Sequence, residues 1–507
     1  MRTFEIVLLL ANLFSLVLLF KRPSRKAWTG ALVANLAAFL AHGMLDGLRY
    51  QMAFAYLFVF LFILYALVKL RFGLARARSP LVLRIGAGLV AVIFLWLSAY
   101  LSYALPVFDL PAPTGDYAVG VQYFHWVDEG RADPFLQPAA PPRELMVKLY
   151  YPAVADDEQP FLPYLGGSPE LARIFAGFYH LPAFAFDQLT LVTTHSKEGL
   201  RVTGGLNGRD GQRFPVVLFL HGAGTGMEVQ TAQSEDLASR GYVVAAIDHT
   251  YVSAGTIFPD RVVEHQQATT NFEVVEPAEI ITQIMADDAR FVIRKLAELN
   301  EGSAGAGFVS RLDLERIGVI GHSVGGAAAY NLAINEPRVK AAVNLDGVVY
   351  ITPGAGRVAP VLVLASETFS RSFVEQRPLM PSLDELPAAD QELMVAIHGG
   401  EAEYQATYER ARQNQAGLSV VAAETGGVYT IQGSAHMKFT DLGLFIGDPN
   451  LRELIQIGGS TTPARCLEIT RALTAAFFDD HLKGDQHLKG QTAPALLYPE
   501  LRQVQVR

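Results

Sequence analysis

The residues best suited to covalent chemistry form the run Gly321-His322-Ser323-Val324-Gly325-Gly326. The stretch before it, Ile317–Ile320, is apolar and of buried-strand type, and Ala327–Asn335 after it favours a helix. Glycines on either side of the serine remove side chains that would collide in a sharp turn, so the serine can take an unfavourable backbone conformation. The pattern Gly-x-Ser-x-Gly in this setting predicts a hydrolase nucleophile, and the alternative is a tight turn without chemistry.

A serine hydroxyl becomes a good nucleophile only when a base takes its proton, and in this kind of fold that base is a histidine late in the chain. Two histidines lie between Ser323 and the last expected helix, His398 and His436. His436 directly follows an expected strand, so a loop can bring its imidazole to the serine. His398 lies in a helical stretch before two glycines, where we expect a solvated or capping side chain.

The base needs an acid that holds its tautomer, and two carboxylates are suitably placed. Asp346 ends the strand expected at 339–345, and Glu367 ends the one expected at 361–365. Either could point inward from the active edge of the sheet. The residues alone leave the choice open.

A tetrahedral intermediate needs two hydrogen-bond donors aimed at its oxyanion. The N–H of Val324, directly after the nucleophile, can supply one, and the N–H of Ala223 in His221-Gly222-Ala223-Gly224 the other. The glycines of this loop allow close approach, although they could equally serve only to turn the chain. His221 is expected to order the loop rather than to act in catalysis.

The elements that must position these residues alternate between strands and helices from about residue 109 onward. Strands are expected at 144–151, 215–220, 242–247, 317–320, 339–345, 361–365 and 428–432, and helices at 230–239, 277–299, 327–335 and 463–482. This alternation predicts an α/β fold with a mostly parallel sheet covered on both faces. Ligands of such sheets bind at the carboxyl ends of the strands, where Ser323 also falls.

Four apolar segments precede this region, and we expect them to form a helical membrane anchor over 1–108, ahead of a catalytic domain over 109–507. The helices are expected at about 4–20, 27–48, 50–70 and 82–105. A signal peptide is disfavoured for the first, because Lys21-Arg22-Pro23 stands where a cleavage site should be. Asn35 and His42 in the second segment are expected to face other helices rather than to form an ion path.

Positive charges gather in two of the loops between these segments. They are Lys21, Arg22, Arg25, Lys26, Lys69, Arg71, Arg76, Arg78 and Arg84, and no further Lys or Arg follows until Arg131. Both loops should be cytoplasmic. With four crossings, the N-terminus and the catalytic domain would then lie on the extracytoplasmic side.

Composition narrows the function classes. Of the 507 residues 50% are hydrophobic, which favours a protein that lies partly in a membrane. The formal net charge of −9 gives no reason to expect nucleic-acid binding. The single cysteine, Cys466, excludes an intrachain disulfide, and no Cys/His spacing suggests a zinc site. An aromatic-rich stretch over 166–200 is expected to be core, although it could also line an acyl pocket or touch the membrane surface.

From about Thr114 to Leu482 the sequence resembles the plasma and type II platelet-activating factor acetylhydrolases, and especially their bacterial membrane-tethered relatives. The matching motifs are Leu149-Tyr150-Tyr151-Pro152, Phe214-Pro215, His221-Gly222-Ala223-Gly224, Asp248-His249, the Ser323 turn, Asn344-Leu345-Asp346-Gly347, Ser366-Glu367-Thr368-Phe369 and Gly433 to Asp441. The resemblance implies a triad of Ser323, Asp346 and His436, oxyanion donors at Ala223 and Val324, and no metal or other cofactor. Glu367 is then a supporting hydrogen-bonding residue.

The resemblance also implies hydrolysis of short or oxidised acyl esters. Val324 stands where the family commonly has phenylalanine, and 371–424 has no clear counterpart, so the acyl preference is not carried over. The expected function is a serine carboxylic ester hydrolase acting through an acyl-enzyme on lipophilic or short-acyl esters, including phospholipid-type esters. The expected partners are this ester substrate and membrane lipid. The alternatives are a short-chain or polyester esterase of dienelactone hydrolase or cutinase type, and a non-catalytic membrane sensor.

Overall fold

The computed structural model describes residues 1–21, 23–73, 80–136, 141–204, 211–265, 275–302, 307–351, 358–375, 378–455, 457–488 and 497–504. Arg22, Arg76 and Arg78 of the expected cytoplasmic loops lie outside these ranges. The chain forms two compact units. One comprises Met1–Asp109, Phe184–Val192 and Phe445–Arg452, and the other Leu110–Ala183, Thr193–Leu444 and Glu453–Arg507.

The larger unit is built on a sheet whose order is β12-β11-β10-β9-β8-β4-β5-β2-β1-β3 in the described residues. Its strands are β1 Ala118–Ala132, β2 Pro142–Ala153, β3 Ser196–Glu198, β4 Phe214–Leu220, β5 Val243–Asp248, β8 Leu312–His322, β9 Val339–Leu345, β10 Val361–Ala365, β11 Gly427–Ile431 and β12 Leu501–Gln503. The run from β11 through β8 to β5 is parallel throughout. A small antiparallel hairpin, β6 Gly255–Ile257 with β7 Val262–Glu264, stands apart from it.

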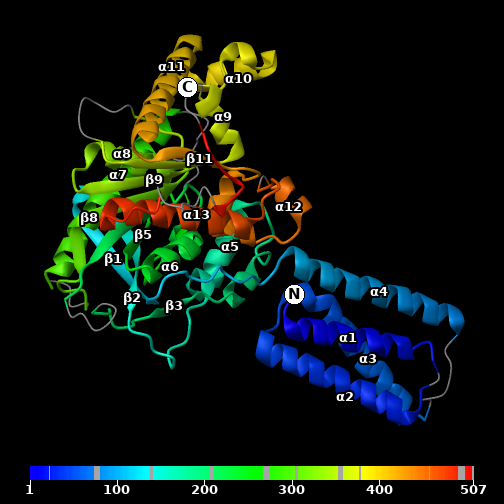
Figure 1. Ribbon diagram of the computed structural model, residues 1–507. Helices are drawn as coiled ribbons and strands as arrows, with labels where there is room; N and C mark the ends of the chain where they lie inside the picture. Colours follow the sequence, from blue (N-terminus) through cyan, green and yellow to red (C-terminus); the bar gives the residue numbers. More distant parts are fainter. Residues whose placement is uncertain are drawn as a thin grey trace. The chain divides into compact units, whose positions relative to one another are not determined.

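Helices cover both faces of this sheet (Figure 1). Their bounds are α5 Pro169–Phe178, α6 Thr231–Ser239, α7 Val275–Asn300, α8 Val324–Asn335, α9 Glu367–Glu375, α10 Ala388–His398, α11 Glu401–Thr425 and α13 Pro463–Phe478, with a short α12 Pro449–Leu454. Side chains of β4 alternate between the two cores. Val216 and Leu218 pack with α7 and α8, whereas Val217 and Phe219 pack with α6 and α13. Both faces are apolar because both are covered.

The expected α/β class is confirmed, and every strand predicted from the sequence has a counterpart. Sequence reasoning missed the long strand β1 and the edge strands β3 and β12. β1 pairs with β2 over most of its length, although its second half alternates buried with exposed positions and carries polar residues. Its partner β2 is buried almost throughout, which made β2 the easier strand to find.

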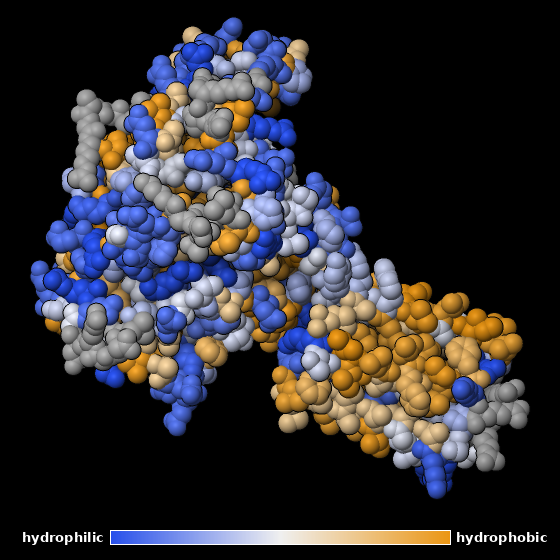
Figure 2. All heavy atoms as spheres, viewed as in Figure 1, coloured by the Kyte–Doolittle hydropathy of each residue, from blue (hydrophilic) through white to orange (hydrophobic). Residues whose placement is uncertain are grey.

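The smaller unit contains four N-terminal helices, α1 Thr3–Leu18, α2 Arg25–Ala41, α3 Ala53–Arg71 and α4 Leu81–Ala104. Three helical stretches are long and apolar enough to cross a membrane, namely Arg25–Asp46, Tyr50–Arg71 and Leu81–Ala104. α1 is shorter. The outward surface of these helices is apolar (Figure 2), with exposed side chains such as Phe60, Leu89 and Ile93, as expected for helices in contact with lipid.

Several polar side chains inside the helical unit are paired with one another. Asn35 lies buried and donates its amide to Ser15 Oγ at 2.5 Å, and His42 Nε2 lies 2.7 Å from Tyr56 Oη. Arg49 is held by Glu5, with Nη2 donating to Oε2 at 2.8 Å. Such pairing is what polar groups between apolar helices require, because hydrocarbon cannot satisfy them.

Two segments from later in the chain complete this unit. Gln51, in the short helical turn Tyr50–Met52 before α3, donates its amide to Gln188 Oε1 at 2.8 Å and so holds the segment Phe184–Val192. The N–H of Gly447 donates to the Ala104 carbonyl at 2.9 Å, so the end of α4 holds the segment Phe445–Arg452. Both segments fall within 109–507, the range expected from the sequence to form the catalytic domain.

Candidate active site

Ser323 occupies a strained turn between β8 and α8, with φ 56° and ψ −127°. A Cβ on Gly321 would lie 2.0 Å from the Gly325 carbonyl oxygen, and a Cβ on Gly325 would lie 2.3 Å from the Leu220 carbonyl oxygen. No side chain fits at either position, so both glycines are required for the turn. The strained residue is the one whose hydroxyl must project from the sheet, which is where backbone strain is expected at functional sites.

The side chains of His436 and Asp346 contact each other directly. His436 Nδ1 donates to Asp346 Oδ2 at 2.7 Å, and Asp346 Oδ1 accepts the N–H of Ser366. The Asp346 side chain is 3% exposed and the His436 side chain 42% exposed. The carboxylate therefore holds the proton on Nδ1 and leaves the lone pair of Nε2 free to act as a base.

Ser323, Asp346 and His436 line one cavity of about 400 Å³. Its other walls are largely apolar and include Val348, Tyr350, Phe369 and Leu379. Among the described contacts Ser323 Oγ has no hydrogen bond to His436, a bond that often tightens only when substrate binds. The arrangement offers a nucleophile, a base and an orienting acid around a space for a small apolar group.

The second carboxylate and the second histidine considered from the sequence, Glu367 and His398, lie outside the cavity. Glu367 Oε2 accepts the N–H of Gly433 at 3.1 Å, so it supports the start of the loop that carries His436. His398 ends α10, where its Nδ1 donates to the Met394 carbonyl at 2.8 Å. Neither residue lines the cavity that contains Ser323.

His322 is a residue of the site that sequence reasoning missed. Its Nε2 donates to the backbone carbonyl of His436 at 2.9 Å, across 114 residues of chain. Burial, reinforced by the neighbouring His436, lowers the pKa of the His322 imidazole well below its usual range, so the ring stays neutral. The available signal was its place directly before the nucleophile.

The loop after β4 lies directly against the nucleophile turn. A Cβ on Gly222 would lie 2.9 Å from His322 Nδ1 and 3.1 Å from Ser323 Cβ. The N–H groups of Ala223 and Val324 have no partner among the described backbone hydrogen bonds. Val324 also begins α8, where the helix dipole adds partial positive charge.

His221 fixes this loop in one conformation. Its Nδ1 donates to the Gly222 carbonyl at 2.8 Å, and its Nε2 accepts the N–H of His249 at 3.0 Å. Burial, together with His249, lowers the pKa of His221 to about 3, which keeps the ring neutral and in this tautomer. His249 is anchored in turn by Asp288 Oδ2 at 2.9 Å. His221 therefore orders the loop.

Two further stretches, the aromatic-rich 166–200 and 371–424, border the site. α5, within the aromatic-rich stretch, is mostly buried on one side, and Phe178 at its end lies against Gly224, where a Cβ would be 2.0 Å from Phe178 Cζ. The stretch 371–424 contributes most of α9 together with α10 and α11, although residues 376 and 377 lie outside the described ranges. Leu379 from this stretch lines the cavity. Within the described ranges no group of His, Cys, Asp and Glu is arranged to hold a metal ion.

A mostly parallel sheet with helices on both faces, and a serine on the turn between a central strand and its helix, define an α/β-hydrolase. The sequence matches the family "Platelet-activating factor acetylhydrolase, isoform II" over residues 106–300 and 262–496, which is more than half of the chain. The chain belongs to this family.

Individual relatives are distant. The chain is 23% identical over 272 residues to a platelet-activating factor acetylhydrolase of Canis lupus familiaris, covering 47% of this chain and 54% of that protein. It is 23% identical over 248 residues to a probable 1-alkyl-2-acetylglycerophosphocholine esterase of Arthroderma benhamiae, covering 47% and 59%. The matched regions thus span just over half the length of these curated relatives. Among solved structures, a ferulic acid esterase from Streptomyces cinnamoneus is 30% identical with a TM-score of 0.57, covering 79% of this chain and 100% of that chain.

Proposed function

We propose that this protein is a serine carboxylic ester hydrolase that acts through an acyl-enzyme. The observation that carries the proposal is the 2.7 Å contact between His436 Nδ1 and Asp346 Oδ2 in the cavity that also contains the strained Ser323. A strained serine with an oriented base has a chemical use, whereas a purely structural turn has no need of either.

In the proposed mechanism His436 Nε2 takes the hydroxyl proton of Ser323 as Oγ attacks the ester carbonyl carbon. The imidazolium is stabilised by the Asp346 carboxylate, and its Nε2 proton passes to the departing alkoxide as the acyl-enzyme forms. Water then attacks the acyl-enzyme with His436 again acting as the base, which releases the acid and restores Ser323.

The negative charge on the carbonyl oxygen is received by the N–H groups of Ala223 and Val324. Both belong to backbone that is fixed before the reaction, since His221 holds the loop and α8 begins at Val324. Fixed donors need no reorganisation as charge develops, and one such donor contributes roughly 2.7–4 kcal/mol in other hydrolases.

The proposed substrates are lipophilic or short-acyl esters, including phospholipid-type esters such as 2-acetyl glycerophospholipids. The supporting observations are family membership and a cavity whose walls include Val348, Tyr350 and Phe369. A second candidate is a general esterase of short or aromatic acyl esters. The structural similarity to a ferulic acid esterase favours it, as that protein is covered along its whole length.

We further propose that the protein is a multi-pass membrane protein with its hydrolase unit on the extracytoplasmic side. The basic residues near the ends of α1 and α3 support this orientation if α1 also crosses. α1 has 16 residues, and its length of about 24 Å falls short of a hydrocarbon core of about 30 Å, so its crossing needs flanking residues or a thinner bilayer. Protease accessibility of the hydrolase unit in sealed, right-side-out vesicles tests the orientation.

The test of function compares wild type with Ser323→Ala in the full-length, detergent-solubilised protein. Hydrolysis of p-nitrophenyl acetate, butyrate and octanoate should collapse in the variant, and a fluorophosphonate should label Ser323 in the wild type only. Ser310→Ala, which removes an exposed serine from the loop before β8, is the matched control. Equal turnover by Ser323→Ala and wild type would reject the mechanism, and ester binding without turnover by wild type would favour the sensor.

The second experiment separates the substrate classes. Turnover of a 2-acetyl glycerophospholipid should exceed that of methyl ferulate if the protein acts on phospholipid-type esters. The reverse ratio, with Ser323 still required, would assign the general esterase instead.

A further inference from the structure

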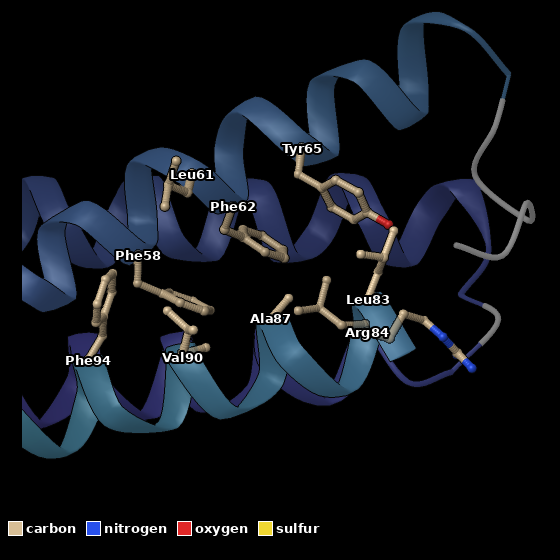
Figure 3. A pocket seen from close by; sticks show the side chains of 11 residues that line it. Phe58, Leu61, Phe62, Tyr65, Leu83, Arg84, Ala87, Val90 and Phe94 are labelled. Atoms are coloured by element: carbon tan, nitrogen blue, oxygen red, sulfur yellow. The ribbon is translucent and has the colours of Figure 1, made fainter. Parts of the chain in front are cut away.

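Helices α3 and α4 enclose a groove of about 350 Å³ along the helical unit (Figure 3). α3 contributes Phe58, Phe62 and Tyr65, and α4 contributes Ala87, Val90 and Phe94. The α4 residues recur every three to four positions, so they form one continuous stripe along the helix. The small Ala87 opposite aromatic rings leaves the space that an extended hydrocarbon chain can occupy.

One end of this groove carries a positive charge. Arg84 lines it there, and Figure 3 shows its guanidinium extending beyond the apolar side chains toward the end of the helices. Arg84 Nε is buried and has no hydrogen-bond partner among the described residues. α4 begins at Leu81, and its helix dipole adds partial positive charge at the same end. No side chain in the described part of the chain caps the first N–H groups of the helix there. Among the described residues no carboxylate pairs with Arg84, so this end of the groove carries positive charge that no side chain offsets.

The length of the groove matches one leaflet of a membrane. Arg84 and Phe94 are ten residues apart on α4, which corresponds to about 15 Å along the axis. Half of a hydrocarbon core of about 30 Å is the depth that one acyl chain occupies. A phosphate at Arg84 would thus stand at the membrane surface with its acyl chain directed inward along the groove.

We propose that the α3–α4 groove is a binding site for an anionic phospholipid, with one acyl chain in the groove and the headgroup phosphate on Arg84. A zwitterionic lipid can fill the same apolar space but gains less from an unpaired guanidinium, because its own cation offsets the phosphate. The site lies within the helical unit and is independent of ester hydrolysis.

Native mass spectrometry of the full-length protein, titrated with diether phosphatidylglycerol or diether phosphatidylcholine of the same chain length, tests this site. Diether lipids carry no carboxylic ester, so hydrolysis cannot remove them. We expect about a fivefold preference for phosphatidylglycerol, the effect of one basic residue near an anionic headgroup. Arg84→Gln should abolish the preference, Arg84→Lys should retain it, and Ala87→Phe should weaken binding of both lipids by filling the groove.

Two matched variants control for general effects. Arg25→Gln removes an exposed basic residue from the start of α2, and Leu89→Phe enlarges an exposed α4 side chain that does not line the groove. Both should bind lipid as the wild type does. Equal binding of the two lipids by the wild type, an unchanged preference in Arg84→Gln, or normal binding by Ala87→Phe would each overturn the proposal. If Arg84→Gln fails to fold, the wild-type preference and Ala87→Phe still decide.

Discussion

Replacing Asp346 by asparagine should disable the proposed base while leaving the fold intact. The Ser366 N–H points at Asp346 Oδ1 and needs an acceptor, so the asparagine amide oxygen should take that position. The amide NH₂ then faces His436 Nδ1, where Oδ2 now lies at 2.7 Å. It can only donate, so Nδ1 must present a lone pair and the imidazole proton moves to Nε2, the nitrogen that must be free to take the proton of Ser323.

The expected loss is about 10⁴-fold in kcat, or about 5.5 kcal/mol, the size seen when a triad aspartate is replaced in this way. Water is a poor substitute for the lost carboxylate because the Asp346 side chain is only 3% exposed. Glu367→Gln is the matched control, since the glutamine oxygen can still accept the Gly433 N–H, and its kcat should stay within about tenfold of wild type.

The assay is hydrolysis of p-nitrophenyl butyrate by all three proteins between pH 5 and pH 9, with thermal unfolding as a check on folding. The reasoning would be refuted if Asp346→Asn kept a kcat within tenfold of wild type while folding normally. A large loss in Glu367→Gln together with a small one in Asp346→Asn would transfer the orienting role to Glu367.

Three further changes test other parts of the structure. His322→Ala removes the hydrogen bond to the His436 carbonyl and should lower kcat about tenfold with little change in KM. A rise in KM as large as the fall in kcat would argue against a positioning role. Gly321→Ala should destabilise the larger unit by about 3 kcal/mol or prevent folding, because the new Cβ would lie 2.0 Å from the Gly325 carbonyl oxygen. Gly177→Ala in α5 is the control: its Cβ meets nothing within 4 Å, so the variant should unfold no earlier than wild type in a thermal melt. Burial raises the pKa of Asp441 to about 8, so above about pH 4 the folded state retains a proton that the unfolded state has released. The free energy of unfolding should therefore fall as pH rises from about 4 to 8. Asp441→Asn should flatten that decline, and identical melting-temperature differences between pH 5 and pH 8 in both proteins would contradict this assignment.

The fold class followed from local patterns that the tertiary structure did not have to supply. β9 and β10 begin and end at the residues expected from their sequences, because strands buried on both faces are mostly apolar; only Lys340 and Asn344 of β9 are polar. The helical N-terminal region was also evident from composition. Four membrane-crossing helices were expected there, whereas three stretches reach the required length and α1, with 16 residues, is shorter.

The site was only partly accessible to sequence reasoning. The Ser323 turn is local, so glycine spacing and the flanking strand and helix were sufficient to indicate it. The choice between Asp346 and Glu367 was open from the residues, because both end neighbouring parallel strands and both could face the same edge. The structure separates them through contacts. Asp346 bonds the His436 ring, and Glu367 bonds the backbone of Gly433.

The sequence by itself determined the α/β class, the serine turn and the apolar helices, since each depends on residues that are neighbours along the chain. The family resemblance implied Asp346 as the acid, but only the tertiary structure shows its contact with His436 across 90 residues and the hydrogen bond by which His322 supports His436. It also decided that two late segments, Phe184–Val192 and Phe445–Arg452, join the helical unit. Contacts at such separations depend on how the whole chain packs, and no local periodicity records them.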